Sequence, residues 1–145
     1  MDERSTLLWQ HYQNSCFLLT QTLSPPCSFA IITAYNPLGN ILPISHNRLL
    51  DKQLQRDIHK SGCAYRALVG ASQDLQHQEK SWAVYLDKAD AFELAKKYQQ
   101  LAFYFISDGE LQLLPCLAAQ PAINMGEFAK FVRIVEQLPE LHDAQ

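Results

Sequence analysis

The sequence of 145 residues lacks the apolar segments that mark membrane and exported proteins. Its apolar runs are as long as strands, and none approaches the roughly 20 residues that a membrane-spanning helix needs. The first residues, MDERSTLLW, include no basic segment followed by an apolar one, so they do not indicate an export signal. We therefore expect a cytoplasmic protein without a membrane partner.

Paired cysteine motifs are also missing. The four cysteines are far apart in the sequence and form no C-x-x-C pair, which removes the usual signature of a zinc or dithiol site. They are Cys16, Cys27, Cys63 and Cys116. Buried reduced thiols are the simplest interpretation, and two disulfides are the alternative. We predict no metal site and no cofactor.

The sequence contains none of the common nucleotide-binding or hydrolase motifs. The patterns G-x-x-x-x-G-K-[ST], G-x-G-x-x-G, G-x-S-x-G and H-E-x-x-H do not occur. The net charge of −3 differs from the strongly basic charge typical of nucleic-acid binders, so binding to nucleic acid is not favoured. The common enzyme classes therefore have no support from motifs.

The composition is that of one folded domain. Hydrophobic residues make up 48% and charged residues 19% of the chain, which is typical of globular proteins. The clearest strand signal is FAIITAYNP. Residues 28–35 are apolar on both faces, as expected of a central strand covered on both sides, and Asn36, Pro37 and Gly39 end it.

Hydrophobic spacing predicts the other elements. Pro25 and Pro26 predict a turn between the first two strands, which we expect to pair antiparallel. Ser45 is the expected N-cap of the second helix, Gly62 its end, and Asp87 the cap of the third helix. The expected helices are 2–13, 45–60, 89–99 and one starting near 124, and the further strands are 15–20, 64–71, 81–86 and the hairpin 103–107 with 110–114.

These elements predict an α+β fold. We expect a mixed, mostly antiparallel sheet of about six strands, with helices 45–60 and 89–99 packed on it and a helix near each terminus flanking it. The whole chain, 1–145, forms one domain. Its core spans about 28–114, and about 115–145 form a helical extension, which docks on the sheet or binds a partner.

Several short motifs in this core resemble those of a known family. They are T-A-Y-N-P at the strand end, Asn47 at the next helix start, G-A-S-x-D followed by H-x-E-x-S, and Q-x-A-F before the hairpin. In their order and spacing the chain resembles an uncharacterised bacterial family, domain of unknown function 3293. The resemblance covers about 28–114 and implies a small α+β domain without an established activity.

Polar residues around the end of the central strand are the candidate ligand-binding groups. Asn36 follows the strand and Asn47 begins the next helix, so their amides would suit an anionic or carbonyl ligand beside free helix N–H groups. The simpler alternative is that Asn36 satisfies the local turn. The predicted ligand-binding residues are Thr33, Asn36, Asn47, Ser72 and Gln100.

His77, Glu79 and Ser81 alternate in the sequence. If the strand begins before Ser81, all three point to one face, where they would form an acid/base set. The alternative is a polar loop that enters a strand. Two metal ligands at this spacing are too few for a metal site.

A basic row follows the second helix. Its members recur every four residues, namely Arg48, Lys52, Arg56 and Lys60, and a solvated helix face is the usual explanation of such a row. Weak nucleic-acid contact is the alternative. By helical angle Asn47 and Asp57 fall toward the apolar side, where a polar group needs a partner or a purpose.

The function that this pattern favours is a binding or regulatory domain that recognises a small polar ligand or a protein partner. Asn36, Asn47 and residues 77–81 would form its crevice. A small hydrolase or transferase that uses His77 and Glu79 is the alternative. Convergence of these side chains is the observation that keeps the enzyme possible.

Overall fold

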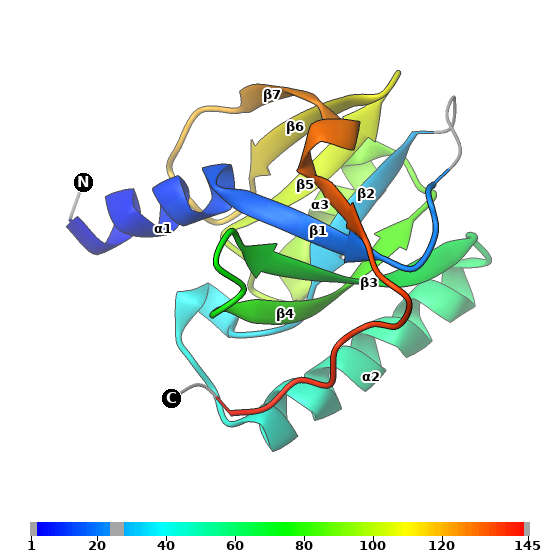
Figure 1. The fold of residues 1–145 in the computed structure, drawn as a ribbon. Coiled ribbons are helices and arrows are strands. Elements are labelled where there is room, and N and C mark those ends of the chain that lie inside the picture. Colours follow the sequence, from blue (N-terminus) through cyan, green and yellow to red (C-terminus); the bar gives the residue numbers. More distant parts are fainter. Residues whose placement is uncertain (1–2, 24–27, 144–145) are drawn as a thin grey trace.

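The computed structural model describes residues 3–23 and 28–143, which form three α-helices and one sheet of eight strands (Figure 1). The helices are α1 (Glu3–Gln13), α2 (Ile44–Ser61) and α3 (Lys88–Lys97). The strands are β1 (Ser15–Leu19), β2 (Phe29–Thr33), β3 (Tyr65–Ser72), β4 (Gln78–Val84), β5 (Ala102–Ser107), β6 (Glu110–Pro115), β7 (Ile123–Glu127) and β8 (Val132–Ile134). The α+β class is confirmed, but the sheet has more strands than the six expected.

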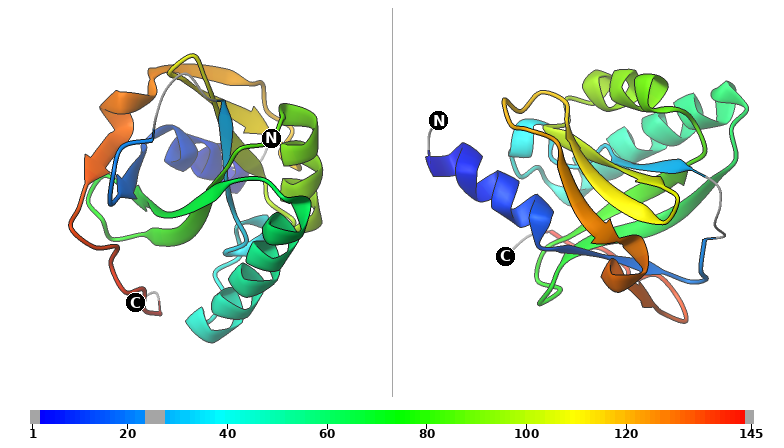
Figure 2. Two further views of the ribbon diagram at one scale, coloured as in Figure 1. Left: turned by 90° about the vertical axis from the view of Figure 1, so that its right-hand side faces the viewer. Right: turned by 90° about the horizontal axis from the view of Figure 1, so that it is seen from above.

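The sheet is mixed and mostly antiparallel, in the order β7-β6-β5-β2-β4-β3-β1-β8. Only the pair of β1 and β8 is parallel among the described strands. The sheet curls into a half-barrel, and α2 and α3 lie on its outer face (Figure 2). The two edge strands, β7 and β8, follow each other in the chain through the 3₁₀ helix η2 (Phe128–Phe131).

Strand β2 lies in the middle of the sheet with a hydrophobic core on each side, as its sequence predicts. Phe29 and Ile31 point into the half-barrel, where they join residues of most other strands and Trp9 of α1. Ala30 and Ile32 face outward against α2 and α3. The absence of a polar face in this strand is therefore explained by burial on both sides.

Local signals place several element ends correctly. Helix α2 ends at Gly62, whose φ of 77° is the left-handed conformation that glycine adopts without strain. Asp87 caps α3 by accepting a hydrogen bond from the Asp90 N–H at 2.8 Å. Asp108 and Gly109, with φ of 51° and 76°, form the predicted tight turn between β5 and β6.

The predicted pairing of the first two strands is wrong. β1 pairs with β3 and β8, whereas β2 pairs with β4 and β5. Neighbours in sequence are therefore separated in the sheet by β4 and β3. The turn expected at Pro25 and Pro26 lies outside the described residues.

The predicted last helix is also wrong. Its sequence forms β7, η2 and β8, and an extended segment follows. Gly126, with φ of 95°, does not fit a helix, and β7 pairs with β6 instead. Phe128 turns into the half-barrel and packs on Phe17 and Phe29, with ring centroids 5.5 and 5.6 Å apart. The apolar residues whose spacing predicted a helix thus belong to the segment that joins the two edge strands, and Phe128 packs in the core inside the half-barrel.

The start of α2 differs from its prediction as well. The helix begins at Ile44, one residue before the expected cap Ser45, and no side chain of the cap residue bonds to it. The carboxylate of Asp143 instead accepts from the Ile44 N–H at 2.6 Å. The C-terminal segment packs through Leu138 and Leu141 on β1 and β3. It meets α2 near the start of the helix, where Arg48 donates to the carbonyl of Leu141 at 2.8 Å (Figure 1).

Cys16, Cys63 and Cys116 are free thiols, and Cys27 lies outside the described residues. Two disulfides are therefore excluded. None of the three described helices is long and apolar enough to span a membrane.

Candidate functional site

Four of the predicted polar residues meet at the end of β2. The Asn36 Nδ2 donates to Glu79 Oε2 at 2.9 Å, and the His77 Nε2 lies 3.2 Å from the same oxygen. On the other side the Asn47 Nδ2 donates to Asn36 Oδ1 at 2.8 Å. The side chains of Asn47, Asn36, Glu79 and His77 thus form one connected chain, which we call the Glu79 chain.

Strand β4 places Glu79 and Ser81 on one face, and His77, just before the strand, contacts only the Glu79 side chain of these two. The strand begins at Gln78, earlier than the sequence suggested, so Glu79 and Ser81 alternate with residues of the outer face. Both share the inner face with Ala83, a member of the core inside the half-barrel. Ser81 is buried, and its hydroxyl donates to the carbonyl of Glu79 at 3.2 Å.

Asn36 has a conformation that few residues tolerate. Its φ of 51° and ψ of 60° lie in the left-handed region, where asparagine is enriched. Its N–H donates to Asn47 Oδ1 at 2.9 Å, and its Oδ1 also accepts from the Leu42 N–H at 3.0 Å. With exposed fractions of 8% and 3%, Asn36 and Asn47 are buried, and their amides bond to protein atoms.

Glu79 and His77 are the members of the chain that reach solvent. The Glu79 side chain is 22% exposed and the His77 side chain 55%. The hydrogen bond to Glu79 raises the pKa of His77 above its ordinary 6.5, and partial burial opposes the shift. Oε2 takes both hydrogen bonds, so Oε1 of Glu79 has no donor among the described residues.

Two tyrosines inside the half-barrel lie in the field of this carboxylate. Burial is the main reason why the pKa values of Tyr12 and Tyr104 are raised, and the negative charge of Glu79 adds to both shifts. The Tyr104 hydroxyl donates to the carbonyl of Tyr12 at 2.6 Å and lies 3.0 Å from the Ser15 hydroxyl. The sequence did not indicate either tyrosine as a site residue, because the apolar spacing of both segments predicts only a buried side chain at these positions.

The other predicted ligand-binding residues do not join the Glu79 chain through their side chains. Thr33 donates to the carbonyl of Lys80 at 2.6 Å. Ser72 bonds to Asp74 at 2.7 Å and to the backbone N–H of His77 at 3.0 Å. Ser72 belongs to β3, which is separated from β2 by β4, so Ser72 does not lie on a strand next to the central one.

Gln100 is buried, with an exposed fraction of 3%. Helix α3 ends at Lys97, earlier than expected, and so Gln100 lies beyond it. Its Nε2 donates to the carbonyls of Tyr35 and Tyr98, each at 3.1 Å. Gln100 therefore holds the chain just after β2.

The helix α2 turns its acidic residues toward the protein. Asp51 accepts from Trp82 Nε1 at 2.7 Å and lies 3.3 Å from Lys80 Nζ, a contact that sequence reasoning missed. Asp57, suspected from its angle, accepts from the Tyr98 hydroxyl and pairs with Lys97 at 2.8 Å. Hydrogen bonding therefore accounts for both carboxylates.

The basic row lies on the exposed face of α2, and its members are Arg48, Lys52, Arg56 and Lys60. Arg48 donates to the carbonyl of Leu141 at 2.8 Å. Within the described ranges, no three His, Cys, Asp or Glu side chains gather closely enough to hold a metal ion.

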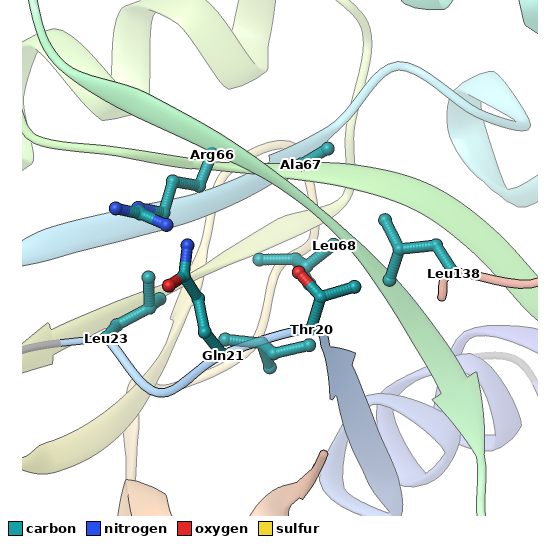
Figure 3. Close-up of a pocket in the computed structure, with 8 residues that line it drawn as sticks. Thr20, Gln21, Leu23, Arg66, Ala67, Leu68 and Leu138 are labelled. Atoms are coloured by element: carbon teal, nitrogen blue, oxygen red, sulfur yellow. The ribbon is translucent and has the colours of Figure 1, made fainter. Parts of the chain in front are cut away.

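A cavity of about 190 Å³ lies at the end of β1 (Figure 3). Thr20, Gln21 and Leu23 line it from that side, and Arg66 and Leu138 from β3 and the C-terminal segment. None of the residues predicted for a site lines this cavity. A second cavity, of about 270 Å³, borders α1.

Residues 32–103 match the model of a family described as "Protein of unknown function (DUF3293)". Through this segment the chain belongs to the DUF3293 family. The match begins in β2 and ends in β5, so it contains every residue of the Glu79 chain. No curated protein and no solved structure matches the chain. The DUF3293 description names no activity, and so the function is open.

Proposed function

We propose that this DUF3293 protein is a binding domain for a small polar ligand, and that Glu79 and His77 contact the ligand. The observation that carries the proposal is the state of the Glu79 carboxylate. One oxygen is held by Asn36 and His77, whereas the other has no donor among residues 3–23 and 28–143, and the side chain is 22% exposed. An ionised carboxylate only accepts hydrogen bonds, so the ligand would supply a donor such as an ammonium or amide group.

The rest of the Glu79 chain supports this role by fixing the carboxylate. Asn36 holds Glu79, and Asn47 and the Leu42 N–H in turn hold the amide of Asn36. A group positioned by buried hydrogen-bonded neighbours loses little freedom when a ligand arrives. In this proposal the asparagines position the carboxylate, and Glu79 and His77, which reach solvent, contact the ligand.

Binding is favoured over covalent catalysis because no nucleophile among the described residues bonds to His77. The hydroxyls of Ser81 and Thr33 donate to backbone carbonyls, and Ser72 donates to Asp74. Across the described part of the chain, the His77 ring bonds to the Glu79 carboxylate and to no hydroxyl or thiol. A nucleophile paired with its base is the usual sign of covalent catalysis.

Thermal unfolding with a panel of small amines, amides and amino acids tests the proposal. Ligands that bind only the folded protein raise its melting temperature. We expect hits with the wild type and at least a tenfold weaker affinity for E79Q, measured by titration calorimetry. E110Q, which removes an exposed carboxylate from the β5–β6 hairpin, is the matched control and keeps the affinity. Equal affinities of E79Q and E110Q for every hit would refute the proposed contact.

General acid–base catalysis is a second candidate, supported by the 3.2 Å contact of His77 with Glu79. A carboxylate that holds one ring nitrogen of a histidine leaves the other nitrogen to activate water. A hydrolase would show turnover of ester or amide substrates that H77Q abolishes. Binding without turnover in the wild type would reject catalysis and retain the binding domain.

A further inference from the structure

The pairing of β1 with β3 stops before either strand ends, at Leu18 and Val69. Strand β3 extends four residues beyond Val69, to Tyr65, whereas the carbonyl of Leu19 accepts from the Val135 N–H of the C-terminal segment at 2.8 Å. In the described ranges, no backbone hydrogen bond crosses from the residues after β1 to β3. The cavity of about 190 Å³ lies in this gap, and residues from both of its sides form the wall (Figure 3).

The cavity in the gap has an apolar wall from both faces of the sheet. Leu19, Leu23 and Leu68 belong to the core inside the half-barrel. Leu138 packs with residues of β1 and β3 on the outer face. Hydrocarbon side chains of both faces thus meet in the gap, where they would hold the apolar part of a ligand.

The cation that lines this cavity is the guanidinium of Arg66. Side chains alternate along a strand, so Arg66 lies on the same face of β3 as Leu68, and its charge stands beside the apolar wall. The Arg66 side chain is exposed and makes no hydrogen bond or ion pair with the described residues. Figure 3 shows the amide of Gln21 turned toward the guanidinium. The residues that line the cavity include no acidic one, so its polar end offers donors and positive charge.

A carboxylate is the group that suits this polar end. The guanidinium stays protonated, and its planar fork of N–H donors matches the two oxygens of a carboxylate. The Gln21 amide can donate a further hydrogen bond. A cationic ligand would meet repulsion from Arg66 without a compensating anion in the wall.

This cavity is separate from the Glu79 chain. In the pairing of β3 with β4, Glu79 lies opposite Gly70, four residues along β3 from Arg66, which places the two charged positions about 13 Å apart. No member of the Glu79 chain lines the cavity. The two positions also have opposite charge, so they select ligands of different chemistry.

We propose that the gap between β1 and β3 binds a small ionised carboxylic acid, with the carboxylate on Arg66 and Gln21 and the hydrocarbon tail among the leucines. The volume sets the length of the tail, because a cavity of about 150 Å³ holds benzene and drug-sized pockets begin near 300 Å³. At about 190 Å³ the cavity suits an acid of about six carbons. This site does not depend on the ligand proposed for Glu79.

Titration of the ¹⁵N-labelled full chain with hexanoate, followed by nuclear magnetic resonance, tests the proposal. Hexanamide has the same tail without the charge, and acetate has the charge without the tail. We expect saturable shifts of the Ala67 and Leu68 amide resonances and an affinity for hexanoate at least about fivefold above that for hexanamide, because charge-assisted hydrogen bonds are the stronger ones. Acetate should bind at least about tenfold more weakly, because it buries no tail. No saturable shift at these amides, or equal affinity for hexanamide, would overturn the proposal.

Replacing Arg66 tests the contact with the carboxylate. R66Q should weaken hexanoate binding at least about fivefold, since only the charged fork is lost. Arg66 makes no bond within the described ranges, so R66Q should keep the melting temperature of the wild type. The matched control is R56Q, which changes an exposed arginine of α2, alters the net charge equally and should leave hexanoate binding unchanged. Equal affinities of R66Q and R56Q would reject Arg66 as the carboxylate contact.

A bulky side chain at the gap locates the bound tail. T20W changes an exposed residue of the cavity wall and should weaken hexanoate binding at least about tenfold by filling the space. Q53W adds the same side chain at an exposed position of α2 and should have no effect. E79Q should bind hexanoate as the wild type does, so the outcome here is read separately from that for the Glu79 ligand. Unchanged binding in T20W would place hexanoate elsewhere and reject the gap as its site.

Discussion

The side chain of Asn36, at the end of the central strand, donates to the carboxylate of Glu79 on the neighbouring strand at 2.9 Å. Asn36 makes this contact from a left-handed backbone conformation, and its amide oxygen accepts two further hydrogen bonds. Asn36, three residues after the end of β2, therefore also sets the position of the Glu79 carboxylate. A change in the loop after β2 should therefore also displace the Glu79 carboxylate of the candidate site.

Replacing Asn36 by glycine tests this link. Glycine keeps the positive φ but removes three side-chain hydrogen bonds and leaves the Leu42 N–H unpaired, so we expect a loss of about 2–4 kcal/mol in the free energy of unfolding. Urea denaturation measures it. The control N40G removes an exposed bond to Arg4 and should cost less than about 1 kcal/mol. Similar losses in both variants would show that the buried bonds contribute little.

The pair of His77 and Glu79 makes stability depend on pH. The pKa of His77 is higher in the folded state than its ordinary 6.5, so protonated His77 stabilises the fold. This contribution is complete below about pH 6.5 and is lost as the pH rises through the folded-state pKa. H77Q should therefore lose more stability at about pH 6 than at about pH 9. The difference should be about 0.2–1 kcal/mol, because the ring is half exposed.

Denaturation curves of the wild type and H77Q at the two pH values check the sign. Q53A, which changes an exposed residue of α2 that has no ionisable side chain, is the control and should show no such difference. A larger loss for H77Q at about pH 9 would contradict the raised pKa.

Asp51 and Trp82 form a buried contact between α2 and β4. D51A leaves the Trp82 N–H unpaired and removes the partner of Lys80, so it should cost about 2–4 kcal/mol. D51N keeps an oxygen acceptor and should lose less. In a double-mutant cycle W82F should cost less in the D51A background than alone, because the shared bond is already absent. Additive losses would show that the bond does not couple the two residues.

The sequence predicts well those elements whose signal is local. Apolar periodicity places β2, α2 and α3, and turn chemistry at Asp108 and Gly109 places the hairpin. Strand pairing depends on residues far apart in the chain, so the partners of β1 did not follow from its own pattern. The helix predicted after Pro115 is wrong for the same reason, because the conformation there depends on the packing of Phe128 against the distant residues Phe17 and Phe29.

In the candidate site, too, local features could be predicted from the sequence and long-range contacts could not. Alternation predicts that Glu79 and Ser81 share a face, and the order of elements brings Asn36 and Asn47 to it. The exposure of each side chain depends on tertiary contacts that no local pattern contains. The asparagines bond to each other, and Trp9 of α1 lines a cavity together with residues 117–120, which are distant in the sequence.

The last prediction concerns Asp143, which accepts from the Ile44 N–H at the start of α2. A carboxylate at a helix N-terminus satisfies a free N–H and interacts well with the helix dipole. D143A should therefore reduce the free energy of unfolding by about 1 kcal/mol, a typical value for the loss of a cap. It should also speed amide hydrogen exchange at Ile44. E140A removes a nearby exposed carboxylate that makes no such bond among the described residues, and it should change neither quantity. Equal exchange at Ile44 in D143A and E140A would mean that the C-terminal segment does not cap this helix in solution.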